Sequence, residues 1–185
     1  MDSEYSISYS TTIDSINENF IIDDFQTLTK EHIITYISLY FSKIIKSNHK
    51  KISNYKKEND DFYSRKIPLL TIENFLYRIM KYSQMEKSTL IIAFIYILHL
   101  IEKENYFICK NNIYRIILAS CLIASKFNEE NQYKNSYFGK IGGLNLSDIN
   151  YLEYTFISKI NFEIFVSENE FYFIIDKIIK SEKKL

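Results

Sequence analysis

Three histidines, two cysteines, a glycine-rich stretch and two pairs of acidic residues could carry chemistry in this chain. His32, His49 and His99 are isolated from one another. His99 and Glu102 are three positions apart, on one face of a helix, but two ligands do not make a metal site. We expect a helix histidine near a carboxylate there. The sequence predicts no metal and no other cofactor.

The stretch GKIGG at residues 139–143 superficially suggests a phosphate-binding loop. A P-loop needs two glycines five positions apart, then Lys and Ser or Thr, between a strand and a helix. Neither that order nor a predicted strand is present. The pairs Glu129–Glu130 and Asp60–Asp61 lie in polar stretches, whereas catalytic acids must converge in a cleft. We therefore predict that the chain is not an enzyme.

Cys109 and Cys121 are twelve residues apart, with no Cys-x-x-Cys motif and no histidine pair beside them. We expect two reduced thiols and a cytoplasmic or nuclear protein, with a disulfide as the alternative. The first residues are polar and acidic, unlike a secretory signal peptide. The longest apolar run, residues 90–101, is shorter than the roughly twenty residues of a membrane-spanning helix. We expect no membrane association.

The chain has 185 residues and carries 23 basic and 23 acidic side chains. A neutral chain has no electrostatic reason to bind nucleic acid or an anionic membrane. Lys and Tyr are interleaved over residues 50–66, which suggests an RNA-stacking surface, but Glu58, Asp60 and Asp61 lie in the same stretch. Ile, Asn, Lys and Tyr are abundant throughout, so we discount such patches and predict a solvated linker and no nucleic-acid binding.

Helices must position all these residues, because three glycines and one proline provide little of the punctuation that strands need. Apolar residues recur at helical spacing over 31–46, 71–82, 87–103, 112–128, 147–160 and 167–181. Thr71 and Ser147 are predicted N-caps, and Ser167 with Glu170 predicts a capping box. The small residues of 112–128 favour a central position. We expect 129–145 to be a long ordered loop.

From Ile72 to Phe171 the sequence resembles a cyclin box, in particular that of the short P- or U-type cyclins. The resemblance is carried by TIENFLYRIMKY at 71–82, IYR at 113–115, ASKFNE at 124–129, NSYFGKIGGL at 135–144, NYLE at 150–153 and NFEIFV at 161–166. The likeness covers roughly residues 31–181. Two departures stand out: the second helix reads YILHL at 96–100 where the family has YLDRF, and we expect a single box without the second box of mitotic-type cyclins.

The resemblance implies an all-α fold, a five-helix cyclin box with an additional N-terminal helix. The predicted domains are a mostly disordered N-terminal segment (1–28), an N-terminal helix with a polar linker (29–66) and the cyclin box (67–181). The resemblance to cyclins further implies a noncatalytic regulatory subunit that is monomeric before it binds a kinase. Such a subunit activates a cyclin-dependent-type Ser/Thr protein kinase by positioning the kinase helix αC, for example in control of the cell cycle. A cyclin-fold adaptor without kinase activation is the alternative.

Six residues match positions through which the family contacts the kinase. Lys126 and Glu153 match the charged pair of positions around αC, and the apolar positions match Phe127, Ile157, Phe162 and Ile164. The sequence also allows a structural role: Lys126 is favourable near a helix C-terminus, and Glu153 could be a solvated helix residue. The apolar residues could be plain core packing, and for Phe162 the two interpretations are evenly balanced.

Overall fold

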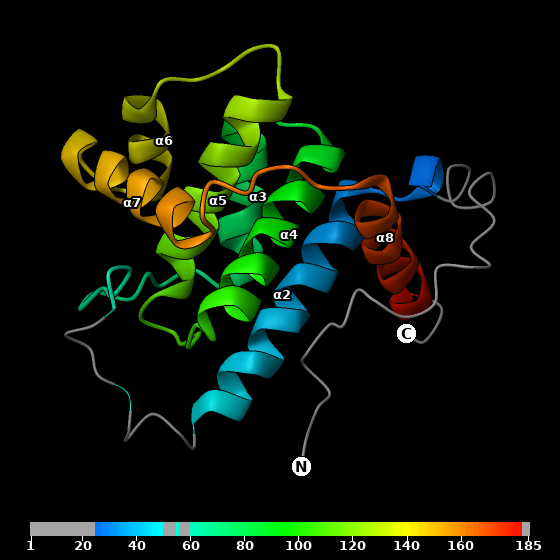
Figure 1. Cartoon of the computed structure of the whole chain (residues 1–185), viewed down its shortest axis with the longest axis horizontal. Coiled ribbons are helices and arrows are strands. Elements are labelled where there is room, and N and C mark those ends of the chain that lie inside the picture. Colours follow the sequence, from blue (N-terminus) through cyan, green and yellow to red (C-terminus); the bar gives the residue numbers. More distant parts are fainter. Residues whose placement is uncertain (1–24, 50–54, 56–59, 183–185) are drawn as a thin grey trace.

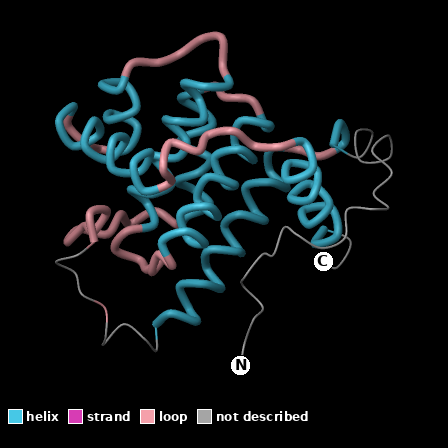
Figure 2. Tube along the Cα trace, viewed as in Figure 1, coloured by secondary structure: helices cyan, strands magenta, loops and turns pink. Residues whose placement is uncertain are grey.

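The computed structural model describes residues 25–49, 55 and 60–182 of the chain. Over these ranges the protein is helical with no strand (Figure 2). The helices are α2 (Lys30–Asn48), α3 (Ile72–Ser83), α4 (Lys87–Glu104), α5 (Ile113–Asn128), α6 (Asn135–Gly142), α7 (Leu146–Lys159) and α8 (Glu168–Glu182) (Figure 1). The all-α prediction is confirmed. Most of the predicted disordered segment 1–28 lies outside the described residues.

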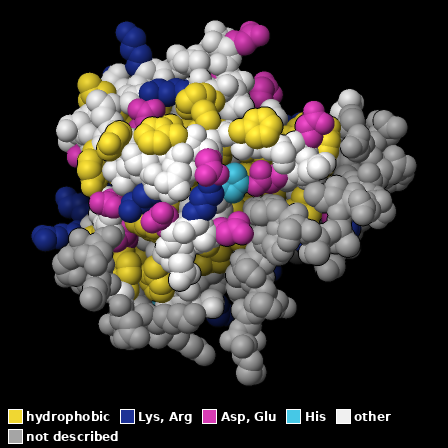
Figure 3. All heavy atoms as spheres, viewed as in Figure 1, with side chains coloured by type: hydrophobic (Ala, Val, Ile, Leu, Met, Phe, Trp, Pro, Cys, Tyr) yellow, Lys and Arg dark blue, Asp and Glu magenta, His cyan; other side chains and the backbone are white. Residues whose placement is uncertain are grey.

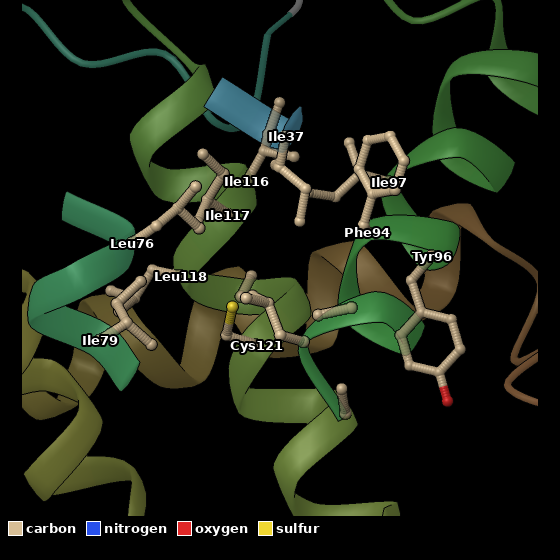
Figure 4. Close-up of a cluster of buried hydrophobic side chains, with 14 of the residues drawn as sticks. Ile37, Leu76, Ile79, Phe94, Tyr96, Ile97, Ile116, Ile117, Leu118 and Cys121 are labelled. Atoms are coloured by element: carbon tan, nitrogen blue, oxygen red, sulfur yellow. The ribbon is translucent and has the colours of Figure 1, made fainter. Parts of the chain in front are cut away.

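Helix α5 is the centre of the structure, as its small residues predict. It packs against α3, α4, α6 and α7, and it is buried from Ile116 to Ser125. Ala119, Ser120 and Ala124 let neighbouring helices approach its backbone closely. The core cluster in Figure 4 joins α5 to the flanking helices through Ile37, Leu76, Ile79, Phe94, Tyr96, Ile97, Ile116, Ile117, Leu118 and Cys121.

The predicted loop 129–145 is wrong for eight of its seventeen residues, because Asn135–Gly142 form α6. Phe138 and Ile141 of this helix are buried against the box. A helix of eight residues is too short to give a clear periodic pattern in the sequence. Such a short helix is also unstable in isolation, so packing against the box stabilises it. Gly143 ends it in the left-handed conformation, with φ at +71°. A Cβ on Gly142 would lie 2.1 Å from Leu118 Cδ2, so glycine is needed where α6 meets α5.

The predicted helix caps are partly confirmed. Thr71 Oγ1 accepts a hydrogen bond from the Asn74 N–H at 3.1 Å, and Ser167 Oγ accepts from the Glu170 N–H at 3.3 Å. Ser147 is not a cap: α7 begins two residues earlier, and Asn145 Oδ1 accepts from the Asp148 N–H at 2.8 Å. Asn145 is as good a capping residue as Ser147, so the type of residue alone did not locate the start of the helix.

Residues 60–66 fall within the predicted linker yet pack against the box. The Phe62 side chain is fully buried and meets the Phe156 ring edge-on, with centroids 6.0 Å apart. Asp60 accepts hydrogen bonds from Asn112 Nδ2 at 2.9 Å and from the Tyr106 hydroxyl. The Ser64 N–H donates to the Asn111 carbonyl at 2.8 Å. These bonds fix the end of the linker against the start of α5.

Candidate partner-binding surface

Lys126 and Glu153 come together as an ion pair where the last turn of α5 crosses α7. Lys126 Nζ lies 2.6 Å from Glu153 Oε1, and the two side chains keep 33% and 21% of their surface exposed. The other carboxylate oxygen of Glu153 accepts a hydrogen bond from Asn135 Nδ2 at 2.7 Å. Asn135 also donates to Asn150 Oδ1 at 2.8 Å. The start of α6 therefore orients the carboxylate, a role that sequence reasoning missed.

Phe127, which follows Lys126, and Phe162, in the segment after α7, are exposed and not buried in the core. Their exposed fractions are 56% and 62%, so the core-packing interpretation of Phe162 does not hold. Tyr151, Tyr154 and Phe165 are also exposed, at 53%, 68% and 83%. Figure 3 shows hydrophobic side chains gathered over α7 and the segment that follows it. Because Tyr is abundant throughout the chain, composition gave no signal for these tyrosines.

The backbone that carries Phe162 is strained. Asn161 and Phe162 both have positive φ, at +56° and +59°. Asn tolerates the left-handed region, whereas a bulky side chain rarely occupies it. The Phe162 N–H donates to the Ile157 carbonyl at 2.9 Å and closes the end of α7. The turn thus holds a phenyl ring in solvent at a conformational cost of about 1 kcal/mol or more.

Ile157 and Ile164 differ from the exposed phenylalanines because both are half-buried and pack against the core. The Ile164 carbonyl accepts a hydrogen bond from the Tyr96 hydroxyl at 2.8 Å, which ties the segment after α7 to α4. The six predicted site residues therefore divide into three kinds: a partly buried ion pair, two exposed rings and two half-buried aliphatic side chains. All six belong to α5, α7 or the segment after α7.

Sequence comparison places this arrangement in a known family. A sequence model of the family described as Cyclin matches residues 25–164, well over half of the chain. This chain belongs to the cyclin family. Cyclins are noncatalytic regulatory proteins, so the chain is not an enzyme, as the sequence predicted.

Named cyclins of plants show how far the similarity extends. Cyclin-U2-1 of Arabidopsis thaliana is 37% identical over 111 residues, which are 60% of this cyclin and 50% of the relative. Cyclin-U4-1 of the same plant is 27% identical over 142 residues, 75% of this cyclin and 70% of the relative. Cyclin-P3-1 of Oryza sativa is 21% identical over 141 residues, 75% and 60% of the two chains. The chain thus covers about half the length of Cyclin-U2-1, and the P/U-type resemblance is confirmed.

The departure at the second box helix of this cyclin is accommodated inside the fold. Leu98 is buried, with 4% of its surface exposed. His99 Nε2 lies 2.5 Å from Glu170 Oε1 of α8, so the histidine meets a carboxylate, but of a distant helix and not of Glu102 on its own helix. Among the described residues no three metal-ligating side chains come together. The histidine that stands at the family's Arg position therefore joins α4 to α8.

The two cysteine thiols of this cyclin are free and buried, so the disulfide alternative does not hold. Burial raises the pKa of Cys121 to about 12, and it also raises the pKa of Cys109. Both thiols therefore stay protonated and unreactive at neutral pH. Over the described part of the chain, no helix is long and apolar enough to cross a membrane.

Proposed function

We propose that this cyclin is the regulatory subunit of a cyclin-dependent-type Ser/Thr kinase and activates it by positioning the kinase helix αC. Protein kinases need an ion pair between a strand lysine and an αC glutamate to place the ATP phosphates. A rigid helical surface that binds the αC-in state more tightly shifts the kinase population toward that state. The cyclin then needs a shaped surface with a few polar anchors, and no reactive group.

The left-handed, exposed Phe162 is the observation that carries this proposal. The phenyl ring stays 62% exposed on a backbone that disfavours any bulky side chain, so it lowers the stability of the isolated protein in two ways. Strain of this kind persists at binding sites, where a partner compensates for it. Burial of such a ring in a partner pocket contributes about 1.5–3 kcal/mol. Aromatic residues of this type dominate many interfaces.

Lys126 and Glu153 supply polar anchors that are already oriented. Each charge is only partly exposed, so a partner has to remove little further water from either. The Lys126 ammonium has three donor hydrogens, and Glu153 accepts one of them. We propose that the pair contacts polar groups around αC and that Phe127, Ile157, Phe162 and Ile164 bury apolar area around it. A stable complex of this kind buries about 800 Å² on each side.

The test is affinity capture of a partner with the full chain, followed by a kinase assay with and without added cyclin. We expect a cyclin-dependent-type kinase to be captured and its activity to depend on the cyclin. Phe162→Asn should weaken both effects while the chain remains folded. Capture of no kinase, or a kinase equally active without the cyclin, would contradict the proposal.

A cyclin-fold adaptor that does not activate a kinase is the second candidate. The observation that favours it is the replacement of the family Asp-Arg pair by Leu98 and His99. Leu98 is buried and the His99 side chain is 12% exposed and paired with Glu170, so this helix offers a partner no charged pair at the positions where the family has Asp and Arg. The kinase assay separates the two functions, because an adaptor would bind its partner through α5 and α7 and leave kinase activity unchanged.

A further inference from the structure

Two adjoining hollows lie at the end of the molecule where α5 begins. The first, of about 570 Å³, lies between residues 63–68, α3 and the end of α6. The second, of about 530 Å³, lies between the same segment and the C-terminal end of α2. Ile67, Pro68 and Tyr114 line both hollows. We call the two together the cationic groove, for the charges described next.

Positively charged side chains line the cationic groove on both sides of residues 63–68. The cations are Arg65, Lys66 and Arg115 in the first hollow and Lys46 and Lys110 in the second. None of the described residues that line either hollow is Asp or Glu. The whole chain has equal numbers of acidic and basic residues, so this charge separation is local. The groove therefore favours an anionic occupant.

The floor and rim of the groove are apolar. Phe75 and Leu118 line the first hollow, and Ile72 and Ile113 line the second. Leu69 follows directly on the shared Ile67–Pro68 segment, and its side chain is fully exposed. An exposed leucine near several cations favours binding of a peptide that carries both acidic and apolar side chains. The acidic groups would pair with the cations, and the apolar groups would pack against the leucine.

The segment between the hollows is held in place without an occupant. Arg115 Nη1 donates to the Tyr63 carbonyl at 3.0 Å, and the Tyr114 hydroxyl donates to the Leu70 carbonyl at 2.5 Å. Asn111 Nδ2 donates to the Ser64 carbonyl at 2.8 Å. The groove walls are thus formed before binding, which lowers the entropic cost of association.

We propose that residues 1–24 of this same chain bind in the cationic groove. This segment has six acidic residues, no Lys and no Arg, and among them stand eight Ile, Phe or Tyr residues. Its composition therefore combines the anionic and apolar character that the groove complements. Tethering gives such a segment an effective concentration of the order of millimolar, an advantage that an acidic peptide of another protein lacks.

The tether is long enough. The first described residue, Phe25, lies close to the N-terminal end of α2. It is held there by Lys87, whose Nζ donates hydrogen bonds to the Phe25 carbonyl at 2.7 Å and to the Leu28 carbonyl at 2.9 Å. The second hollow lies at the other end of α2, about 28 Å away for a helix of 19 residues. Twenty-four residues span up to about 80 Å when extended. Fewer than half of them are needed to reach the groove.

Zero-length carbodiimide crosslinking of the wild-type chain tests the contact directly. The reagent joins a carboxylate to an amine only where the two touch, and mass spectrometry identifies the joined residues. We expect Asp14 and Glu18 to crosslink to Lys46, Lys66 or Lys110 within one chain, and these products to disappear at about 1 M salt, where the Debye length is about 3 Å. Crosslinks to the exposed Lys81 and Lys134 instead, or crosslinks only between chains, would overturn the proposal.

A tryptophan reporter gives an independent measurement. The natural chain has no Trp, so Phe20→Trp introduces a single fluorophore into the segment. We expect blue-shifted emission that moves to the red when Lys46, Lys66 and Lys110 are replaced by Glu. The matched control replaces the exposed Lys81, Lys134 and Lys177 by Glu, with the same change in net charge. The emission of this control should stay blue-shifted.

Two results would overturn the assignment. One is solvent-exposed emission in the Phe20→Trp parent, combined with saturable binding of an added acidic peptide to the groove, which would make a partner the occupant. The other is an equal red shift in the groove variant and its control. Circular dichroism melting of both triple variants establishes that the fold is intact, and neither measurement requires a kinase.

Discussion

The two ends of α5 present opposite kinds of surface. At the C-terminal end, Lys126 is neutralised by Glu153 and flanked by exposed aromatic rings. At the N-terminal end, Arg115 faces a groove whose described lining has cations and no carboxylate. About 17 Å of buried helix separates Arg115 from Lys126. One central helix thus has two kinds of surface, paired charge with apolar rings at one end and unbalanced charge at the other.

Helix α6 connects the two ends. Its first residue, Asn135, donates to Glu153, while its last, Gly142, lies against Leu118 and lines the cationic groove. Helix α6 therefore links two surfaces whose chemistry differs. Mutations in one should leave binding at the other unchanged unless they act through α6.

The largest effect is expected from Glu153→Ala. This variant leaves Lys126 and Asn135 without their shared partner, and truncation of one member of a desolvated pair costs about 2–5 kcal/mol in binding. Kinase affinity, measured by titration calorimetry, should fall at least tenfold, and Lys126→Ala should behave alike. The pair is partly exposed, so the loss of folding stability should stay below about 1 kcal/mol. Normal activation by either variant would return both residues to a structural role.

Gly142→Val should give the next largest effect, now on folding. The new side chain would collide with Leu118, and overpacking of this kind costs about 1–3 kcal/mol. Gly143→Val should also destabilise, because its φ is +71°, whereas Gly143→Asn tolerates that conformation and serves as the control. Thermal melting followed by circular dichroism measures all three. Wild-type melting of Gly142→Val would contradict the close approach of α6 to α5.

Phe162→Asn should separate stability from binding. Asn occupies the left-handed region more readily than Phe, so the melting temperature should stay equal or rise slightly. Kinase binding should nevertheless weaken severalfold, since the exposed ring is lost. Phe156→Leu is the matched control: Phe156 is fully buried, so this change should lower the melting temperature. A melting temperature that drops for Phe162→Asn would show that the ring supports the fold.

The smallest effect is expected from the triple replacement of Lys46, Lys66 and Lys110 by Glu. All three side chains are exposed, so folding stability should change by about 0.5 kcal/mol or less for each. Kinase affinity measured as for Glu153→Ala should also remain near wild type at physiological salt, where the Debye length of about 8 Å is shorter than the separation of the two surfaces. A tenfold loss of kinase affinity would show that the two ends of α5 are not independent.

The sequence predicted the long elements well because their apolar periodicity persists over several turns. Helix α2, predicted over 31–46, spans Lys30–Asn48, and the predicted 112–128 corresponds to α5 at Ile113–Asn128. The pairing of Lys126 with Glu153 depends on where α5 crosses α7, which periodicity does not reveal. The resemblance to cyclins predicted that both residues contact the kinase, but it did not predict that they form an ion pair with each other within the chain.

Four features could not be predicted because they depend on packing between distant parts of the chain. Helix α6 is too short for a periodic signal, and Phe62 is a single apolar residue within a polar stretch. The positive φ of Phe162 follows from the way α7 closes onto Ile157, although the preceding Asn161 is a weak hint of such a turn. The contact between His99 and Glu170 joins residues 71 positions apart.

The labelling rates of the two buried thiols can report how often the structure around each of them opens. A buried, protonated cysteine reacts with a labelling reagent only when the surrounding structure opens, so its labelling rate reports the free energy of that opening. Cys121 lies in the middle of α5 and should react only on global unfolding. Cys109 precedes α5 beside the bonds that fix residues 60–66 and should report fraying of that end alone. A single chain without added probes therefore yields two separate opening rates, one for the core and one for the edge of the cationic groove.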